Sequence, residues 1–206
     1  MTDRPVTGLI LAGGKSTRFG SDKASAFLRG RSLLQWAVSA VGPEVTAVVI
    51  VKAAGQRLPA IEACVPITVV EDQYEGLGPL AGLVTGFAAI RTALCFATSC
   101  DAPLLQASVI RLLASRADEA DVVVPFVGGF MQPLAAIYRV AACAPVFGED
   151  LHANKLRIVP AYSRLRTVVV NEDDLVAVDP ELLSFRNANR PERLAEIESL
   201  LGAEGR

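Results

Sequence analysis

Short runs of apolar and β-branched residues, separated by segments of helix length, constrain the fold of this chain more than any other feature. Several runs lack the apolar–polar alternation of a half-exposed strand, so helices are expected to cover both of their faces. The predicted strands are Val6–Ala12, Val45–Val51, Ile67–Val70, Leu94–Thr98, Asp121–Pro125, Leu134–Tyr138 and Thr167–Val170. The predicted helices are Ser32–Val41, Pro79–Arg91, Gln106–Ala117 and Pro191–Leu201.

This alternation predicts an α/β fold in three layers, with a doubly wound and mostly parallel sheet. The segment after about Val140 is less regular, and we interpret it as an extension of the same domain, so residues 1–206 are expected to form a single domain. Ligands of such sheets bind beyond the carboxyl ends of the strands. Chemistry is therefore expected directly after the first, third and fourth predicted strands.

The composition excludes several classes of protein. With 51% hydrophobic residues and a mean hydropathy of +0.39, the chain has enough apolar surface to fold and is not intrinsically disordered. A net charge of −2 argues against a nucleic-acid partner, which would require a clustered basic surplus. The longest apolar runs, such as Ala47–Val51, are far shorter than the ~20 residues that span a bilayer, and no signal peptide is recognised. A cytoplasmic protein without a membrane or nucleic-acid partner is expected.

The cysteines and the histidine do not predict a metal or nucleophilic site. No CxxC pair occurs, and His152 is the only histidine. The cysteines are interpreted as small buried residues in a reducing compartment. They are Cys64, Cys95, Cys100 and Cys143.

A glycine-rich turn after the first predicted strand carries the strongest functional signal. From Leu11 to Lys23 the chain reads Leu-Ala-Gly-Gly-Lys-Ser-Thr-Arg-Phe-Gly-Ser-Asp-Lys. Its glycines allow a sharp turn and bring backbone N–H groups close to an anion. Arg18 offers a planar fork for phosphate oxygens and Lys23 a compact charge, so the segment predicts a cradle for a triphosphate.

Two familiar phosphate-binding motifs do not fit this turn. A Walker A loop requires four residues between its first glycine and the Gly-Lys-Ser/Thr end, but five residues separate Gly8 from Gly14. The dinucleotide pattern G-x-G-x-x-G is absent, because Gly13 and Gly14 are adjacent and Gly20 follows after five residues.

The turn instead resembles the motif of the molybdenum cofactor guanylyltransferases, nucleotidyltransferases built on a Rossmann-like sheet. The pattern L-A-G-G-x-S-x-R-[MF]-G-x-D-K matches Leu11 to Lys23. Three later blocks match in the same order: Glu71-Asp72 with Gly78-Pro79-Leu80-Ala81-Gly82, then Cys100-Asp101-Ala102-Pro103, then Asn187-Ala188-Asn189-Arg190-Pro191-Glu192. The resemblance implies a nucleotide-binding half over about residues 1–105 and an acceptor-binding half over about 106–206.

For the nucleotide half, the resemblance implies a GTP site and a bound Mg²⁺. Asp101 would ligate the Mg²⁺, which needs only one or two protein oxygens beside phosphates and waters. Arg18, Lys23 and Asp101 would be the catalytic residues, and the N–H groups of Gly13 and Gly14 would help to hold the triphosphate. The implied GTP contacts are Leu11, Ala12, Gly13, Gly14, Lys23, Asp72, Gly78, Pro79 and Asp101.

For the acceptor half, the resemblance implies that Asn187 and Asn189 bind molybdopterin, since amides offer uncharged donors and acceptors. Proteins that deliver the cofactor and proteins that accept it are implied as further partners. This chain departs from the family at two places. Gln132-Pro133 stands where His-Pro is frequent, and only Asn154–Arg157 represents the usual acidic and basic patch.

The implied reaction transfers GMP from GTP to molybdopterin and releases pyrophosphate. One alternative is a related nucleotidyltransferase, for example a molybdopterin cytidylyltransferase or a sugar-phosphate nucleotidyltransferase. Guanine is favoured over cytosine because Ala12-Gly13-Gly14 stands where cytidylyl relatives tend to read Leu-Ala-Ala-Gly, and because of the Gly78–Gly82 stretch. The other alternative is a non-catalytic GTP-binding adaptor.

Overall fold

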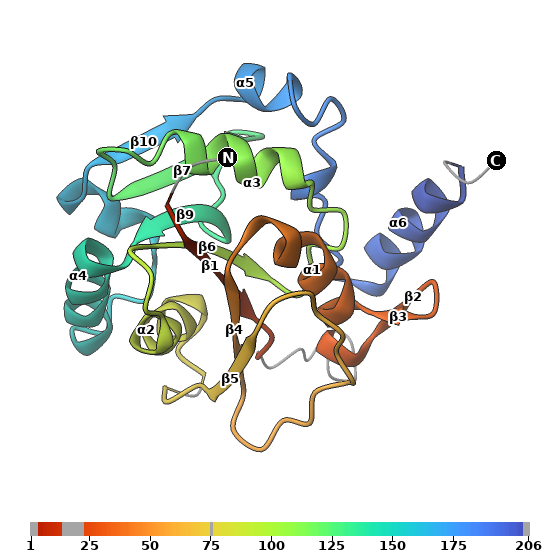
Figure 1. The fold of residues 1–206 in the computed structure, drawn as a ribbon, viewed down its shortest axis with the longest axis horizontal. Helices are drawn as coiled ribbons and strands as arrows, with labels where there is room; N and C mark the ends of the chain where they lie inside the picture. Colours follow the sequence, from red (N-terminus) through yellow and green to blue (C-terminus); the bar gives the residue numbers. More distant parts are fainter. Residues whose placement is uncertain (1–3, 14–22, 75, 204–206) are drawn as a thin grey trace.

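One eight-stranded sheet, covered by helices on both faces, organises the computed structural model, which describes residues 4–13, 23–74 and 76–203 (Figure 1). The order of the main strands is β10-β7-β9-β6-β1-β4-β5, with β8 paired to β7. β9 is antiparallel to β6 and to β7, and the remaining main pairs are parallel. The strands are β1 Val6–Leu11, β4 Ala47–Lys52, β5 Ile67–Glu71, β6 Leu94–Ser99, β7 Val122–Val127, β8 Phe130–Met131, β9 Ala135–Arg139 and β10 Thr167–Val170.

The helices form the two outer layers. α1 and α3 pack on one face of the sheet, and α2 and α4 pack on the other (Figure 1). The α-helices are α1 Leu33–Val41, α2 Pro79–Ala89, α3 Ala107–Ser115, α4 Val140–His152, α5 Glu172–Val176 and α6 Pro191–Ala203. Short 3₁₀ helices are η1 Lys23–Ser25, η2 Gly42–Glu44, η3 Val159–Arg164 and η4 Leu183–Phe185. The predicted three-layer, doubly wound and mostly parallel α/β fold is confirmed.

Burial of β1 explains why its sequence is continuously apolar. All six of its residues are buried. Ile10 joins the core cluster on the α1 and α3 side, whereas Leu9 and Leu11 join the cluster on the α2 and α4 side. A strand whose two faces both meet helices must be apolar at every position, as the sequence predicted.

Close packing of α2 on β1 depends on two glycines in the helix. A Cβ atom at Gly82 would lie 3.0 Å from the Leu11 side chain, and one at Gly86 only 2.3 Å from the Leu9 side chain. Both glycines of α2 therefore allow a side chain of β1 to approach the helix closely.

The predicted elements agree with the structure to within a few residues, and Thr167–Val170 agrees completely. The helix α4 was not predicted, because Pro145 and Gly148 interrupt its pattern and it follows β9 with no intervening loop. The small antiparallel sheet of β2 (Phe27–Leu28) and β3 (Arg31–Ser32) was also not predicted, since two-residue strands carry no periodic signal.

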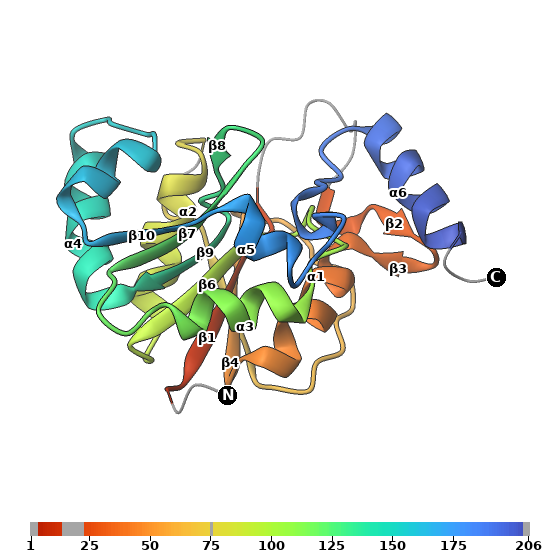
Figure 2. The same ribbon diagram turned by 90° about the horizontal axis from the view of Figure 1, so that it is seen from above.

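The strand directions gather several strand ends at one edge of the sheet. β1, β4, β5, β6, β7 and β10 all run the same way, so their carboxyl ends share this edge. We call it the carboxyl edge; in Figure 2 it includes the start of α2 and the tip of the β7–β8 hairpin. Among the described helices, none is both long and apolar enough to cross a membrane.

Candidate active site

Lys23 and Asp101 come together at the carboxyl edge. The Lys23 ammonium donates to Oδ2 of Asp101, although 78 residues separate the two along the chain. Lys23 opens η1, after the glycine-rich turn, and Asp101 follows the end of β6. Their side chains are 21% and 13% exposed, so the pair lies at the surface but is partly shielded from water. The segment predicted to cradle the triphosphate and the predicted metal ligand Asp101 therefore come into contact through Lys23.

Two further contacts fix the position of Asp101. The Ser99 hydroxyl donates to Oδ1 of Asp101, so each carboxylate oxygen has a partner. The N–H of Ala188 donates to the carbonyl of Asp101 at 2.7 Å. Sequence reasoning missed Ser99, which ends β6 directly after Thr98 and carries no distinct signal of its own.

The Ala188 contact brings the predicted acceptor residues to the same place. Ala188 is fully buried, whereas its neighbours Asn187 and Asn189 are exposed. The structure therefore places both asparagines beside the Asp101 backbone, with their side chains toward solvent.

The start of the glycine-rich turn is hydrogen-bonded to β4, and Gly13 itself is exposed. The N–H groups of Ala12 and Gly13 both donate to the carbonyl of Val51, at 2.8 and 3.1 Å. The Gly13 N–H is thus bonded near the end of β4 in this structure, and its contact with phosphate stays a prediction. A glycine is also required here by packing, since a Cβ would lie 2.7 Å from the backbone nitrogen of Ala53.

The remaining predicted residues of the turn differ in how they are placed. The side chains of Leu11 and Ala12 are buried, so a nucleotide could meet only their backbone. The Leu11 carbonyl accepts from the N–H of Cys100 at 3.1 Å, which ties the turn to the end of β6. Gly14 and Arg18 lie outside the described residues.

Asp72 joins β5 to α2. Its Oδ1 accepts from the N–H of Tyr74 at 3.0 Å and from the Thr85 hydroxyl at 3.2 Å. Gly78 has a φ of 80°, which favours glycine, and Pro79 occupies the first turn of α2. Gly78 and Pro79 are exposed, so the predicted guanosine-contacting turn is accessible.

Between Gly13 and Asp72, sequence reasoning missed a polar cluster at the end of β4. Lys52 donates to Glu71 at 2.7 Å and to the Gln56 carbonyl at 3.0 Å. The hydrogen bond from Lys52 is the main reason why the pKa of Glu71 is lowered. The Gln56 amide donates to the Ala12 carbonyl at 3.2 Å, so this cluster supports the turn from the β4 side.

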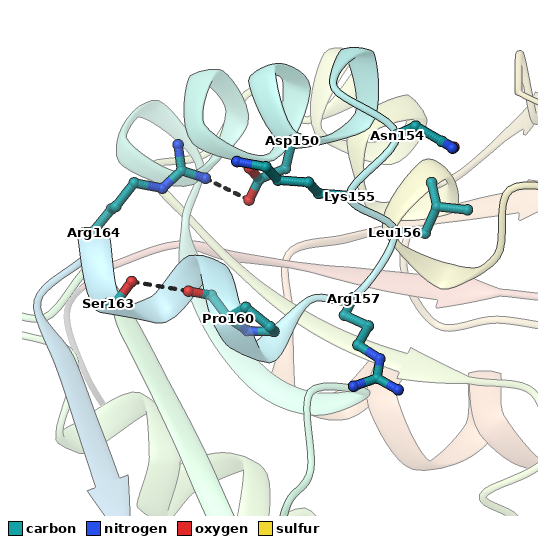
Figure 3. Close-up of a pocket in the computed structure, with 8 residues that line it drawn as sticks. All are labelled: Asp150, Asn154, Lys155, Leu156, Arg157, Pro160, Ser163 and Arg164. Atoms are coloured by element: carbon teal, nitrogen blue, oxygen red, sulfur yellow. Dashed lines mark hydrogen bonds and ion pairs between the residues drawn. The ribbon is translucent and has the colours of Figure 1, made fainter.

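The two departures from the family pattern lie in the β7–β8 hairpin and beside a cavity between α4 and η3. The side-chain amide of Gln132 donates to the carbonyls of Val127 and Phe130, both at 3.3 Å, and so braces the β7–β8 hairpin. The Asn154–Arg157 segment lines a cavity of about 560 Å³ between α4 and η3 (Figure 3).

Arg164 supplies the main charge contacts of this cavity. It binds Asp150 (Figure 3), and it also binds Glu149 at 3.1 Å. The other residues that line the cavity are Asn154, Lys155, Leu156, Arg157, Pro160 and Ser163.

The described part of the chain holds no cluster of three or more histidine, cysteine or acidic residues that could ligate a metal alone. A phosphate-bridged Mg²⁺ does not need such a cluster, because phosphates and waters fill most of its six positions. The Asp101 carboxylate at the carboxyl edge fits that requirement. Cys95, Cys100 and Cys143 are buried and unbridged, as predicted, whereas Cys64 is exposed.

The comparison with protein families decides the relationship of this chain. Residues 8–181 match the model of the MobA-like NTP transferase domain, which covers well over half of the sequence. This chain belongs to the MobA-like NTP transferase family. The predicted resemblance is thus confirmed, and so is the prediction that the chain is a nucleotidyltransferase.

Individual relatives of this MobA-like protein agree in sequence and fold. A molybdenum cofactor guanylyltransferase of Desulfosudis oleivorans is 34% identical over 200 residues, which cover 96% of each chain. The solved structure of molybdopterin-guanine dinucleotide biosynthesis protein A from Archaeoglobus fulgidus has a TM-score of 0.79 at 23% identity, covering 96% of this chain and 100% of that one.

A cytidylyltransferase shares the fold of this MobA-like protein at lower identity. 2-C-methyl-D-erythritol 4-phosphate cytidylyltransferase from Thermus thermophilus has a TM-score of 0.73 at 17% identity, covering 95% and 98% of the two chains. The nucleotidyltransferase fold is therefore common to enzymes that use different bases.

Proposed function

We propose that this protein transfers GMP from GTP to molybdopterin, giving the guanine dinucleotide form of the cofactor and pyrophosphate. The observation that carries the proposal is the Lys23–Asp101 ion pair, which joins the glycine-rich turn to the end of β6. The guanylyltransferase from D. oleivorans supports GTP over CTP, because it matches almost the whole chain at 34% identity, whereas the cytidylyltransferase shares only the fold.

In the proposed reaction, a phosphate oxygen of molybdopterin attacks the α-phosphorus of GTP. A new phosphorus–oxygen bond forms as the bond to the β-phosphate oxygen breaks, and pyrophosphate leaves with the electron pair. The attacking phosphate is already ionised at neutral pH, so no side chain is needed as a strong base. Alignment and neutralisation of charge would supply the rate enhancement.

We assign Lys23 to the triphosphate and Asp101 to the divalent metal, with Arg18 as a second cation. Family membership is consistent with a divalent metal, and we propose that it is Mg²⁺. When bound, Mg²⁺ would neutralise charge on the phosphate oxygens. The Ser99 hydroxyl orients the carboxylate that would hold it.

The two substrates would approach this pair from different sides. We assign Asp72, Gly78 and Pro79 to guanosine, and in the described structure no donor reaches the second carboxylate oxygen of Asp72. Asn187 and Asn189 would meet molybdopterin. Both halves would then act as one domain, in the cytoplasm, where GTP is available and thiols stay reduced. Proteins that deliver or accept the cofactor would complete the set of partners.

The test incubates the purified protein with α-labelled GTP, Mg²⁺ and molybdopterin, with labelled CTP as the matched control. Labelled dinucleotide and pyrophosphate are expected with GTP and not with CTP. Lys23→Ala and Asp101→Ala should each lower the rate about a hundredfold, because each removes a preorganised charge, while circular dichroism shows a folded protein. Binding of GTP without product would favour the adaptor, and a normal rate for Asp101→Ala would refute the metal assignment.

A further inference from the structure

Phe130 leaves a large aromatic ring unusually open to solvent. Its exposed fraction is 73%, the largest among the exposed large hydrophobic side chains of the described structure. Burial of a phenylalanine side chain would contribute ~2 kcal/mol to stability, and Phe130 does not gain this contribution. We therefore ask what its position could serve.

The hairpin that carries Phe130 stands at the carboxyl edge. β6 and β7 are both antiparallel to β9, so they run in the same direction and end at the same edge. Only β9 lies between them, which separates the ends of β6 and β7 by roughly 10 Å, two strand spacings. Phe130 follows the end of β7 and Asp101 follows the end of β6, so both lie at this edge, with Phe130 on the acceptor-binding half of the chain.

Phe130 lies on the same face of the sheet as the residues that follow β6. Phe130 pairs directly with Val127, so the two side chains share one face of the β7–β8 ribbon. Val127 packs against the core cluster that includes Cys100 and Ala102, the two neighbours of Asp101 in sequence. The opposite pair, Phe126 with Met131, faces away, since Met131 packs on the α2 and α4 side.

The hairpin holds Phe130 firmly. Gly128 and Gly129 both have positive φ, 59° and 82°, as the tight turn of such a hairpin requires. The Gln132 amide bonds to the carbonyls on both sides of this turn, and its N–H donates to the Pro125 carbonyl at 2.9 Å. Because the hairpin already fixes the position of the ring, less conformational entropy is lost when a ligand stacks on it.

The charge around the hairpin indicates which part of a ligand it could receive. One contact of the hairpin is acidic, between the Gly128 N–H and the Glu172 carboxylate at 3.5 Å. An acidic neighbour disfavours a phosphate, whereas a neutral aromatic face favours a flat heteroaromatic ring. Lys23, the cation assigned to the triphosphate, lies instead beside Asp101.

We infer that Phe130 is a stacking platform for the pterin ring of the acceptor, which would orient its phosphate toward the Lys23–Asp101 pair. This inference rests on the proposed function and names the acceptor contact that the two asparagines do not provide. Aromatic side chains stack on flat bases with energies that alanine substitution detects. Phe130 then determines acceptor affinity and leaves GTP binding unaffected.

The experiment measures binding of molybdopterin by titration without GTP, and separately the KM for each substrate. Phe130→Ala should raise the Kd and the KM for molybdopterin about tenfold, because it removes the stacking face, and leave the KM for GTP unchanged. Phe130→Tyr keeps the ring and should stay within about twofold of the wild type. The matched control is Phe27→Ala, at another exposed phenylalanine (67%), on the separate β2–β3 sheet.

An unchanged Kd for Phe130→Ala, or an equal rise for Phe27→Ala, would overturn the inference. Failure of the proposed function gives a different pattern: the wild type would bind molybdopterin but transfer no GMP, and the binding comparison would still decide the role of Phe130. A wild type that does not bind molybdopterin at all would refute both.

Discussion

Tyr138, the largest fully buried side chain, shows how one residue satisfies its polar atom inside an apolar core. Its hydroxyl donates to the Pro133 carbonyl at 2.7 Å and lies 2.7 Å from the Tyr162 hydroxyl. Since its single proton is used on the carbonyl, Tyr162 must be the donor in the second bond. Burial raises the pKa of both phenols, so both stay protonated at neutral pH.

This order of donors predicts unequal effects of two similar substitutions. Tyr138→Phe removes the donor for the Pro133 carbonyl and the acceptor for Tyr162, so it should lower the free energy of unfolding by about 2 kcal/mol. Tyr162→Phe leaves the Pro133 bond intact and should lower it by about 1 kcal/mol. Urea unfolding of the two variants measures both values, and equal losses would contradict the assigned direction.

For single residues, the sequence indicated which charged side chains belong to the candidate site better than it indicated which backbone contacts support them. Lys23 and Asp101 were found because the residue types and their order match phosphate chemistry. The structural reason for Gly13 was not found, because its close approach to Ala53 depends on how β4 ends. Ser99 was overlooked for a similar reason, since only the folded structure brings its hydroxyl to Asp101.

Among the elements, α2 and α4 contain glycines with opposite surroundings. Gly86 in α2 faces the buried Leu9 side chain, whereas a Cβ at Gly148 in α4 would meet no atom within 4 Å. The same substitution therefore tests packing at one site and helix propensity at the other.

Gly86→Ala should destabilise the protein by about 1–3 kcal/mol, because the added methyl group must push Leu9 out of a filled core. Gly148→Ala should stabilise it by up to about 1 kcal/mol, since alanine favours the helix and meets nothing. Thermal unfolding of both variants is the measurement. A neutral Gly86→Ala would mean that α2 can move away from β1 without loss.

The elements also show where periodicity stops being informative. Strands such as Thr167–Val170 were predicted from apolar runs, because burial on two faces leaves a strong signal. The sequence carried no signal for the antiparallel direction of β9, since an antiparallel strand in the centre of a sheet is as apolar as its neighbours. Helix α4 was hidden by its internal Pro145.

Across the whole molecule, Asp121 links three strands at the edge opposite the candidate active site. It precedes β7 and accepts from the Arg166 guanidinium at 2.8 and 3.1 Å, just before β10 begins. Arg139, the last residue of β9, approaches it at 3.9 Å and donates to the carbonyls of Ala117 and Ala120. The hydrogen bond from Arg166 lowers the pKa of Asp121, partly opposed by burial.

A lowered folded-state pKa stabilises the protein above the ordinary aspartate pKa of about 4, and this stability is lost as pH falls through the folded value. Arg166→Gln should therefore lower the unfolding temperature at pH 7, and the difference from the wild type should shrink below about pH 4. The matched control is Arg193→Gln, which breaks an exposed pair with Glu196 within α6. A constant difference at every pH would show that Arg166 acts through packing alone.

The hydrogen bond from Ala188 to Asp101 has a consequence for biosynthesis. The backbone of Asp101, the residue assigned to the metal, is held by an N–H group 87 positions later in the sequence, so a ribosome must add most of the remaining chain before that support exists. A nascent polypeptide released at residue 180 would carry every nucleotide-binding motif yet leave the Asp101 carbonyl without this partner. Such a truncated product would therefore be expected to bind GTP and the metal less tightly than the full-length chain.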